Sequence, residues 1–316
     1  MILPTFVVIG AGRCGTTSLY HYLRQHPQVF MSPVKETNFF SYDGPDRERS
    51  LDGGASDQPV RTLAGYAGLF ARAGGFTAVG EASPRYLYHP QAAERMRALI
   101  PEARLVALFR DPVERAYSSY LAYVRDGSER RSFLEAARDE IEGRNPPSWG
   151  GKWCSVRSGL YHACVSRYLQ LFPRERIRLF LQDDLRQEPA EVLRDVFTLV
   201  GVDPAFEPDV SIRYNKSGLA RSKVVHRLTG KNRVTLALKR VLPGAVRKPV
   251  FALWMKLIAS NFERPHVPPE ARRMLVAYYR DDVRRFQELI GRDLSAWLAP
   301  ETPASGGTRE APGISG

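Results

Sequence analysis

The chain has 316 residues, of which 43% are hydrophobic and 25% are charged, and its formal net charge is +12. These values are typical of a soluble globular protein with a sizeable core and exclude a disordered or fibrous chain. No apolar run approaches the roughly 20 residues of a transmembrane helix, and three cysteines (Cys14, Cys154 and Cys164) are too few for a disulfide framework or a metal site.

Short apolar runs alternate with helical patterns along the chain. The predicted strands are residues 6–9, 78–80, 105–109 and 177–181. The predicted helices are residues 17–24, 112–124, 132–142, 159–171, 189–200 and 269–290, and Asp111 caps the second of them. This alternation favours an α/β fold with a P-loop-like parallel sheet flanked by helices, in a single domain over residues 1–300.

Three other segments lack this pattern. Residues 44–60 are polar and glycine-rich, which predicts a loop, and residues 302–316 are small and polar, which predicts a disordered tail. Before the first strand there is no basic segment and no long apolar core of a secretory signal. We therefore expect a cytoplasmic location and reduced thiols, with a pairing of Cys154 and Cys164 as the alternative.

Basic residues gather in one stretch. Residues 210–262 contain twelve lysines and arginines and no aspartate or glutamate, and apolar residues such as Phe251 and Trp254 lie between them. Such a positive field attracts a nucleotide, an acidic glycan or a lipid head group. We interpret the stretch as a basic helical insertion, with an acceptor lid or a membrane-peripheral surface as alternatives. Apart from charge, no nucleic-acid-binding signature is present.

A glycine-rich loop follows the first predicted strand. Its residues are Gly10, Ala11, Gly12, Arg13, Cys14, Gly15, Thr16 and Thr17, with Ser18 next in the following helix. Backbone N–H groups in such a turn, with the positive end of the helix dipole, hold phosphates. The spacing mimics a Walker A loop, but Thr16 stands where that motif has lysine, and we find no Walker B aspartate. Magnesium-dependent ATP or GTP hydrolysis is therefore disfavoured; a P-loop kinase or NTPase and an anionic-surface binding protein are the alternatives.

Four segments in this order and spacing carry a resemblance. They are the loop at residues 10–17, the segment Lys35-Glu36-Thr37-Asn38-Phe39-Phe40, residues 110–118, and Gly159-Leu160-Tyr161 with residues 168–173. Together they resemble the sulfotransferases that use 3′-phosphoadenosine 5′-phosphosulfate (PAPS), in particular heparan sulfate 3-O-sulfotransferase-like enzymes and their bacterial relatives. The resemblance implies transfer of a sulfuryl group from PAPS to an acceptor hydroxyl, without a metal.

The resemblance also implies a role for each matching residue. The loop residues Arg13, Cys14, Gly15, Thr16, Thr17 and Ser18 are expected to hold the phosphosulfate. Arg110 and Ser118 match the pair that binds the 3′-phosphate. Tyr161, Lys216 and Gly218 lie where relatives contact the nucleotide. Glu36 matches the catalytic base.

The chemistry gives these residue types a reason. Sulfuryl transfer needs in-line geometry and charge stabilisation, so Arg13 and Lys35 are candidates to stabilise the leaving phosphate. A base such as Glu36 must remove the acceptor proton. The alternatives are that Lys35 and Glu36 form a solvated charge pair, and that Arg110 pairs with a nearby carboxylate.

The chain also departs from the heparan-type pattern. Arg13 replaces a lysine, Ala82 stands where those relatives have a lysine, and the cysteine pair that follows their Asn-x-Ser/Thr segment is absent. These differences leave the acceptor open among a glycan, a glycolipid and a secondary metabolite.

Overall fold

A computed structural model describes residues 1–42, 60–144, 155–212, 219–220, 262–263 and 265–300. Its centre is one five-stranded sheet in which all neighbouring strands are parallel, in the order β2-β3-β1-β4-β5. The strands are β1 (Phe6–Gly10), β2 (Val29–Met31), β3 (Ala78–Ala82), β4 (Arg104–Phe109) and β5 (Ile177–Leu181). The predicted α/β class is therefore confirmed.

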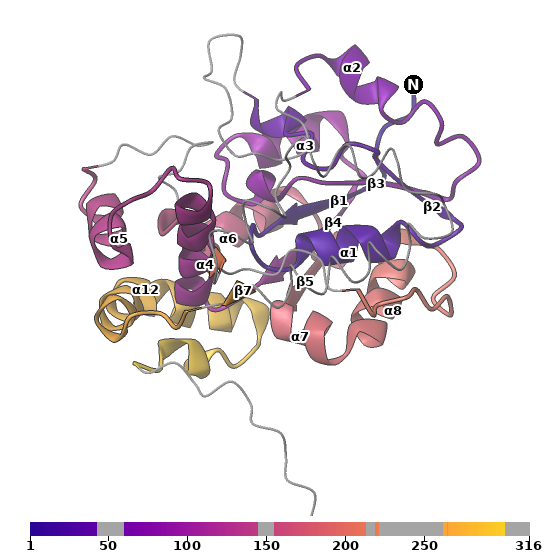
Figure 1. Cartoon of the computed structure of the whole chain (residues 1–316). Coiled ribbons are helices and arrows are strands. Elements are labelled where there is room, and N and C mark those ends of the chain that lie inside the picture. The colour runs from indigo at the N-terminus through magenta and orange to yellow at the C-terminus, as the bar shows by residue number, and fades with distance from the viewer. Residues whose placement is uncertain (43–59, 145–154, 213–218, 221–261, 264, 301–316) are drawn as a thin grey trace, which may run out of the picture.

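Helices cover both faces of this sheet (Figure 1). They are α1 (Thr16–Leu23), α2 (Leu63–Gly68), α3 (Ala92–Leu99), α4 (Pro112–Arg125), α5 (Phe133–Ile141), α6 (Tyr161–Leu171), α7 (Gln182–Gln187), α8 (Pro189–Val200) and α12 (Pro269–Ile290). Short 3₁₀ turns are η1 (Phe39–Ser41), η2 (Pro84–Leu87), η3 (Arg157–Gly159), η4 (Arg174–Arg176) and η5 (Ser295–Leu298). Helix α1 packs on β1, β2 and β3, while α3 and α6 pack against each other.

The core sits around the three central strands. Every residue of β1 and β3 is buried, as is all of β4 except Arg104. Strands that are covered on both faces read as continuous apolar runs, which is why the sequence predicted them. Gly80 of β3 admits no side chain, because a Cβ there would lie 2.2 Å from the Phe6 ring.

Helices with clear end signals form where the sequence predicted them. The Asp111 carboxylate accepts hydrogen bonds from the N–H groups of Val113 (2.8 Å) and Glu114 (3.3 Å) and so caps α4. Helices α8 and α12 match their predicted bounds, and both end at a glycine in the left-handed conformation, Gly201 and Gly291.

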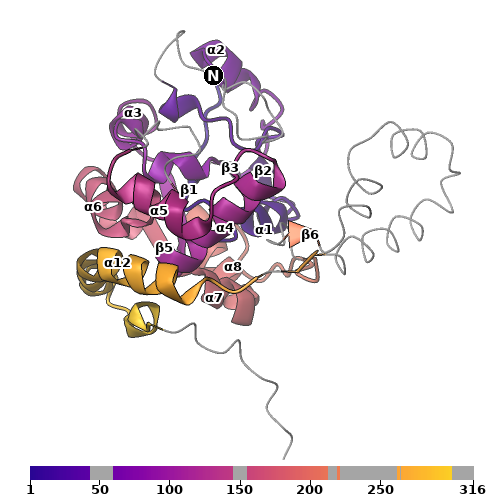
Figure 2. The same ribbon diagram turned by 60° about the vertical axis from the view of Figure 1, so that its left-hand side comes forward.

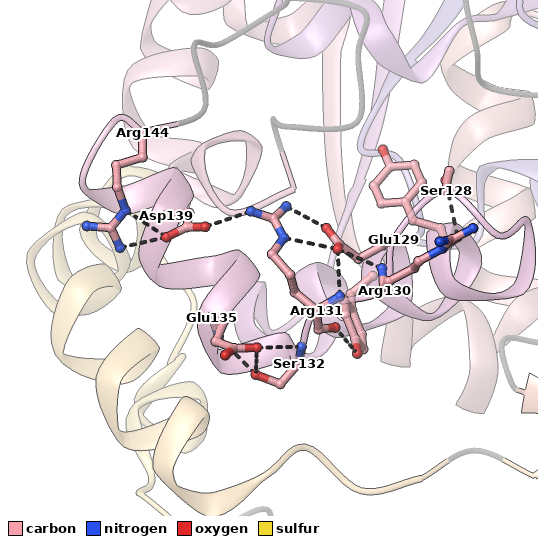
Figure 3. Close-up of polar contacts among 10 residues, drawn as sticks. Ser128, Glu129, Arg130, Arg131, Ser132, Glu135, Asp139 and Arg144 are labelled. Carbon is pink, nitrogen blue, oxygen red and sulfur yellow. Dashed lines mark hydrogen bonds and ion pairs between the residues drawn. The ribbon is translucent and has the colours of Figure 1, made fainter.

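Helix α5 begins at an ion-pair network (Figure 3). Ser132 and Glu135 form its capping box. The Arg131 guanidinium donates to both oxygens of Glu129, at 3.1 and 2.7 Å, and to Asp139 on α5 at 2.6 Å. Arg144 donates to the other oxygen of Asp139 at 2.8 Å. The turn between α4 and α5 is thus held by alternating charges.

Helix α12 lies beneath α4, α5 and α6 (Figure 2). It follows a two-stranded antiparallel pair, β6 (Leu219–Ala220) and β7 (Phe262–Glu263), and β6 lies against α4. The predicted helical insertion falls mainly between these two strands, at residues 221–261, and lies outside the described residues. The predicted loop at 44–60 and the tail at 302–316 lie outside them too, apart from Val60.

Among the described residues no helix is long and apolar enough to cross a membrane. Two of the cysteines, Cys14 and Cys164, are free and buried, whereas Cys154 lies outside the described residues.

Candidate active site

The four segments of the resemblance meet at the carboxyl edge of the sheet. The glycine-rich loop follows β1, and Arg110 follows β4, the strand that pairs with β1. On the other side of β1, the segment after β2 reaches the end of β3, where the Glu36 N–H donates to the Ala82 carbonyl at 2.9 Å. Open parallel sheets bind ligands at this edge.

The phosphate-type loop has the backbone that its sequence predicted. Gly15 precedes the first turn of α1 with φ 97°, a left-handed conformation that favours glycine. Arg13 is also left-handed, with φ 68°, and its side chain is exposed. A Cβ at Gly12 would meet no atom within 4 Å, so the space beside this glycine is open. The loop therefore presents an exposed cation and an open face next to the N-terminus of α1.

Cys14 is the point where three of the segments touch. Burial raises the pKa of its thiol to about 11, and the nearby guanidinium groups of Arg115 and Arg110 oppose that rise, as does a hydrogen bond with Tyr161. The Tyr161 hydroxyl also donates to the Arg110 carbonyl at 2.9 Å. Tyr161 is fully buried, so its side chain links the two loops, and its contact with a nucleotide stays a prediction.

Arg110 is held in place by α4, the helix that follows it. Its guanidinium donates to Glu114, four residues on, at 3.0 Å, and the two side chains are only 11% and 17% exposed. This is the carboxylate pairing that the sequence left open as an alternative. Ser118 lies about two turns into the same helix and is buried. A joint contact of Arg110 and Ser118 with one phosphate stays a prediction.

Lys35 and Glu36 form an ion pair in the segment that follows β2. Lys35 Nζ donates to Glu36 Oε1, and the side chains are 15% and 42% exposed. The Lys35 ammonium also lies close enough to α1 to contribute, after burial and Arg24, to a lowered pKa of His21. Lys35 is therefore near α1 as well as paired with Glu36.

The backbone around Glu36 is unusual. Glu36 and Asn38 have φ values of 63° and 52°. For a residue with a side chain, this conformation costs about 1 kcal/mol or more. Such residues persist only where the surroundings hold them, and here Thr37 between them is fully buried.

What holds Thr37 is a buried carboxylate that the sequence analysis missed. Glu81 of β3 is fully buried and accepts hydrogen bonds from four hydroxyl groups. They belong to Tyr66 (2.6 Å), Thr37 (2.8 Å), Ser83 (2.8 Å) and Tyr86 (2.9 Å). No local signal in the sequence pointed to the partners of Glu81.

The sequence profile of the sulfotransferase family matches residues 4–208. The chain belongs to the sulfotransferase family. The matched range contains all of these loops, from Arg13 to Tyr161.

Individual relatives agree with this membership. A crystallised sulfotransferase from Alicyclobacillus acidocaldarius is 33% identical, with a TM-score of 0.72 over 95% of this chain and 100% of that one. The human bifunctional heparan sulfate N-deacetylase/N-sulfotransferase 3 is 25% identical over 95% of this chain, and carbohydrate sulfotransferase 15 of Rattus norvegicus is 26% identical over 65%. The chain spans 31% of the length of the human N-deacetylase/N-sulfotransferase and 45% of the length of carbohydrate sulfotransferase 15.

Helix α12 supports the site of this sulfotransferase from outside the matched range. Arg272 is fully buried and donates twice to Asp111 Oδ2, both at 3.0 Å. Asp282 accepts from the N–H groups of Tyr161 (2.7 Å) and His162 (3.3 Å) at the start of α6. One helix thereby fixes the residues next to Arg110 and the backbone of Tyr161.

Lys216 and Gly218 lie outside the described residues, so their predicted contacts with the nucleotide stay predictions. In the described part of the chain, no group of three histidine, cysteine or acidic side chains is arranged to hold a metal ion.

Proposed function

We propose that this sulfotransferase moves a sulfuryl group from PAPS to a hydroxyl group of its acceptor, with Glu36 as the base. The observation that carries the proposal is the meeting of the phosphate-type loop, Arg110 and Glu36 at one edge of the sheet. A cradle for the phosphosulfate, a cation for the 3′-phosphate and a carboxylate for the acceptor are thus available together.

The donor fits the groups that line this edge. The N–H groups of the loop before α1 suit the 5′-phosphosulfate, and the open space beside Gly12 leaves room for it. Arg110 suits the 3′-phosphate, because a guanidinium binds phosphate through two parallel hydrogen bonds. Glu114 holds that guanidinium in place.

The reaction then needs one proton transfer and one displacement. The Glu36 carboxylate takes the proton of the acceptor hydroxyl, and the acceptor oxygen forms a bond to sulfur as the bond from sulfur to the phosphate oxygen breaks. The products are the sulfated acceptor and 3′,5′-ADP. Lys35 and Arg13 stabilise the charge that develops on the leaving phosphate.

The acceptor that we propose carries a hydroxyl on a carbohydrate, either in a glycan or in a glycolipid. The support comes from the relatives, whose names include heparan sulfate and carbohydrate sulfotransferases. A hydroxylated secondary metabolite is the other acceptor class to screen. Mass spectrometry for the gain of one SO₃ group across a panel of carbohydrates and hydroxylated secondary metabolites distinguishes these classes.

The donor half can be tested by calorimetry without an acceptor. We expect 3′,5′-ADP to bind much more tightly than ATP or adenosine 5′-phosphate, and binding should not require magnesium. Tight binding of ATP together with no binding of 3′,5′-ADP would overturn the proposal.

The base is tested by Glu36→Gln. The variant keeps the shape of the side chain but cannot take a proton, so we expect kcat to fall by about a hundredfold or more. The affinity for 3′,5′-ADP should stay close to that of the native protein. Normal turnover by this variant would show that Glu36 is not the base.

A further inference from the structure

The four hydroxyl groups around Glu81 are arranged as two pairs. Oε1 accepts from Tyr66 and Tyr86, and Oε2 accepts from Thr37 and Ser83. An ionised carboxylate can only accept hydrogen bonds, so it favours the hydroxyl orientations that point a proton toward Glu81. Thr37 and Tyr86 also lie 2.9 Å apart through their hydroxyl oxygens, and either of the two can be the donor in that contact. Burial raises the pKa of Glu81, while the four hydroxyl groups oppose that rise and favour the ionised form.

The direction of these hydrogen bonds affects the segment that carries Glu36. Once Thr37 and Ser83 have donated to Glu81, their oxygen atoms are left as acceptors. The Ser83 oxygen receives the N–H of Asn38 at 3.3 Å, and the Thr37 oxygen receives the N–H of Phe39 at 3.5 Å. The carboxylate therefore sets the orientation of two hydroxyls, which in turn hold two backbone N–H groups.

These contacts lie immediately after Glu36. On its own N–H, Glu36 is fixed to Ala82, the residue next to Glu81. After it come the buried Thr37 and the left-handed Asn38. Because the backbone is held on both sides of Glu36, only the side-chain torsions of Glu36 remain free to change.

We propose that Glu81 is a positioning residue, which acts through Thr37 and Ser83 to hold Glu36 where it can reach the acceptor hydroxyl. The proposal rests on the proposed function of Glu36 as the base. Glu81 itself is fully buried, so it cannot touch the acceptor.

Thr37→Val tests this relay. Valine keeps the shape of threonine but removes the hydroxyl between Glu81 and Phe39. Because a small misplacement of a reacting group costs up to about a hundredfold in rate, we expect kcat to fall by about tenfold to a hundredfold. The affinity for 3′,5′-ADP should change by less than about twofold, because Thr37 is not among the residues expected to hold the donor. Thr37→Ser, which keeps the hydroxyl, should restore most of the rate.

Tyr66→Phe is the matched control. It also removes one hydroxyl from Glu81, but from Oε1, and it keeps the aromatic ring that stacks on Phe39 with centroids 4.2 Å apart. Its kcat should stay within about threefold of the native value, because the contacts at Asn38 and Phe39 remain. Equal losses in Thr37→Val and Tyr66→Phe would mean that Glu81 only stabilises the fold and would overturn the proposal.

Two further measurements separate positioning from stability. In the Glu36→Gln background, Thr37→Val should cause little further loss, because residues that act as a unit are not additive. Amide exchange of residues 36–39 should be faster in Thr37→Val and unchanged in Tyr66→Phe. The exchange experiment needs no turnover, so it tests the relay even if PAPS proves not to be the donor; unchanged exchange in Thr37→Val would refute it.

Discussion

Arg110 is the residue on which recognition of the donor depends in the proposed function. Its guanidinium is mostly buried, is paired with Glu114 and lies near Cys14 of the glycine-rich loop, and its backbone carbonyl accepts a hydrogen bond from Tyr161. A 3′-phosphate at this position would share the guanidinium with Glu114. Replacing Arg110 should therefore weaken the contact with the 3′-phosphate and leave the contacts with the 5′-phosphate unchanged.

Arg110→Ala should weaken the binding of 3′,5′-ADP by about ten- to a hundredfold, because a hydrogen bond to a charged group is worth about 1.5–3 kcal/mol. Binding of adenosine 5′-phosphate, which lacks the 3′-phosphate, should be nearly unchanged. Glu114→Gln is the control, since it keeps the guanidinium and should retain the affinity for 3′,5′-ADP. If Arg110→Ala weakens both ligands equally in calorimetry, Arg110 does not read the 3′-phosphate.

The sequence predicted residues of this kind when they lie in a contiguous motif, and missed those that do not. Arg110 and Glu36 stand in short segments with a recognisable order. Glu81 binds hydroxyls from Thr37, Tyr66 and Tyr86, which lie after β2, on α2 and on η2, and Thr37 reaches it because β2 pairs with β3. Pairing across a sheet leaves no local trace in the sequence, and for that reason the support of Glu36 was not foreseen.

At the scale of single elements, the turn between α4 and α5 depends on charge. Burial tends to raise the pKa of Glu129, but Arg131 and two backbone N–H groups outweigh it and hold that pKa below its ordinary value. Arg144 and Arg131 likewise lower the pKa of Asp139. The pKa values of both carboxylates are lowered on folding. Their contribution to stability is therefore complete above about pH 5 and is lost as the pH falls through the folded-state pKa values.

Arg131→Met should therefore reduce the free energy of unfolding by about 1–3 kcal/mol at neutral pH, since several hydrogen bonds to charged groups are lost. The difference from the native protein should shrink as the pH falls through the lowered folded-state pKa values, because both carboxylates then take up protons. Urea unfolding at several pH values measures it. Arg130 is the exposed neighbour, and the control variant Arg130→Met should change the free energy of unfolding by less than about 0.5 kcal/mol. A loss in Arg131→Met that does not depend on pH would contradict this account.

Elements were predictable to the extent that they carry their own end signals. Helices α8 and α12, each with a proline at the start and a glycine at the end, match their predicted bounds. Strand β2 has only three residues, α3 has no side-chain cap, and α2 has two glycines, and all three were missed together with α7. Their positions are set by packing on the sheet rather than by local preference.

At the scale of the whole molecule, the C-terminal helix joins parts of the site that are distant in sequence. Arg272 and Asp111 are 161 positions apart. The pair is almost completely buried, and burial raises the pKa of Asp111 while Arg272 opposes that rise. No sequence pattern links these two residues, so the part that α12 plays was visible only in the structure.

Arg272→Met should reduce the free energy of unfolding by about 3–5 kcal/mol, because it leaves the Asp111 carboxylate buried without a partner. Adding Asp111→Asn, which removes that charge and keeps a capping group, should recover part of the loss. Urea denaturation measures both variants. The exposed neighbour provides the control in Arg273→Met, which we expect to be nearly neutral; equal effects at positions 272 and 273 would argue against the buried pair.

The central place of β1 has a consequence for how the chain acquires its site during folding. The strand is the first in the sequence, yet its two neighbours are β3 and β4, and Thr5, just before it, bonds to Val79 across 74 positions. Contacts over such separations form slowly, because closing the long intervening chain costs conformational entropy before the contact contributes any stabilising free energy. The glycine-rich loop lies at the end of this strand, so it reaches its place in the candidate site only when β3 and β4 have paired with β1. The completeness of this edge of the sheet therefore depends on long-range pairing and not on the loop sequence alone.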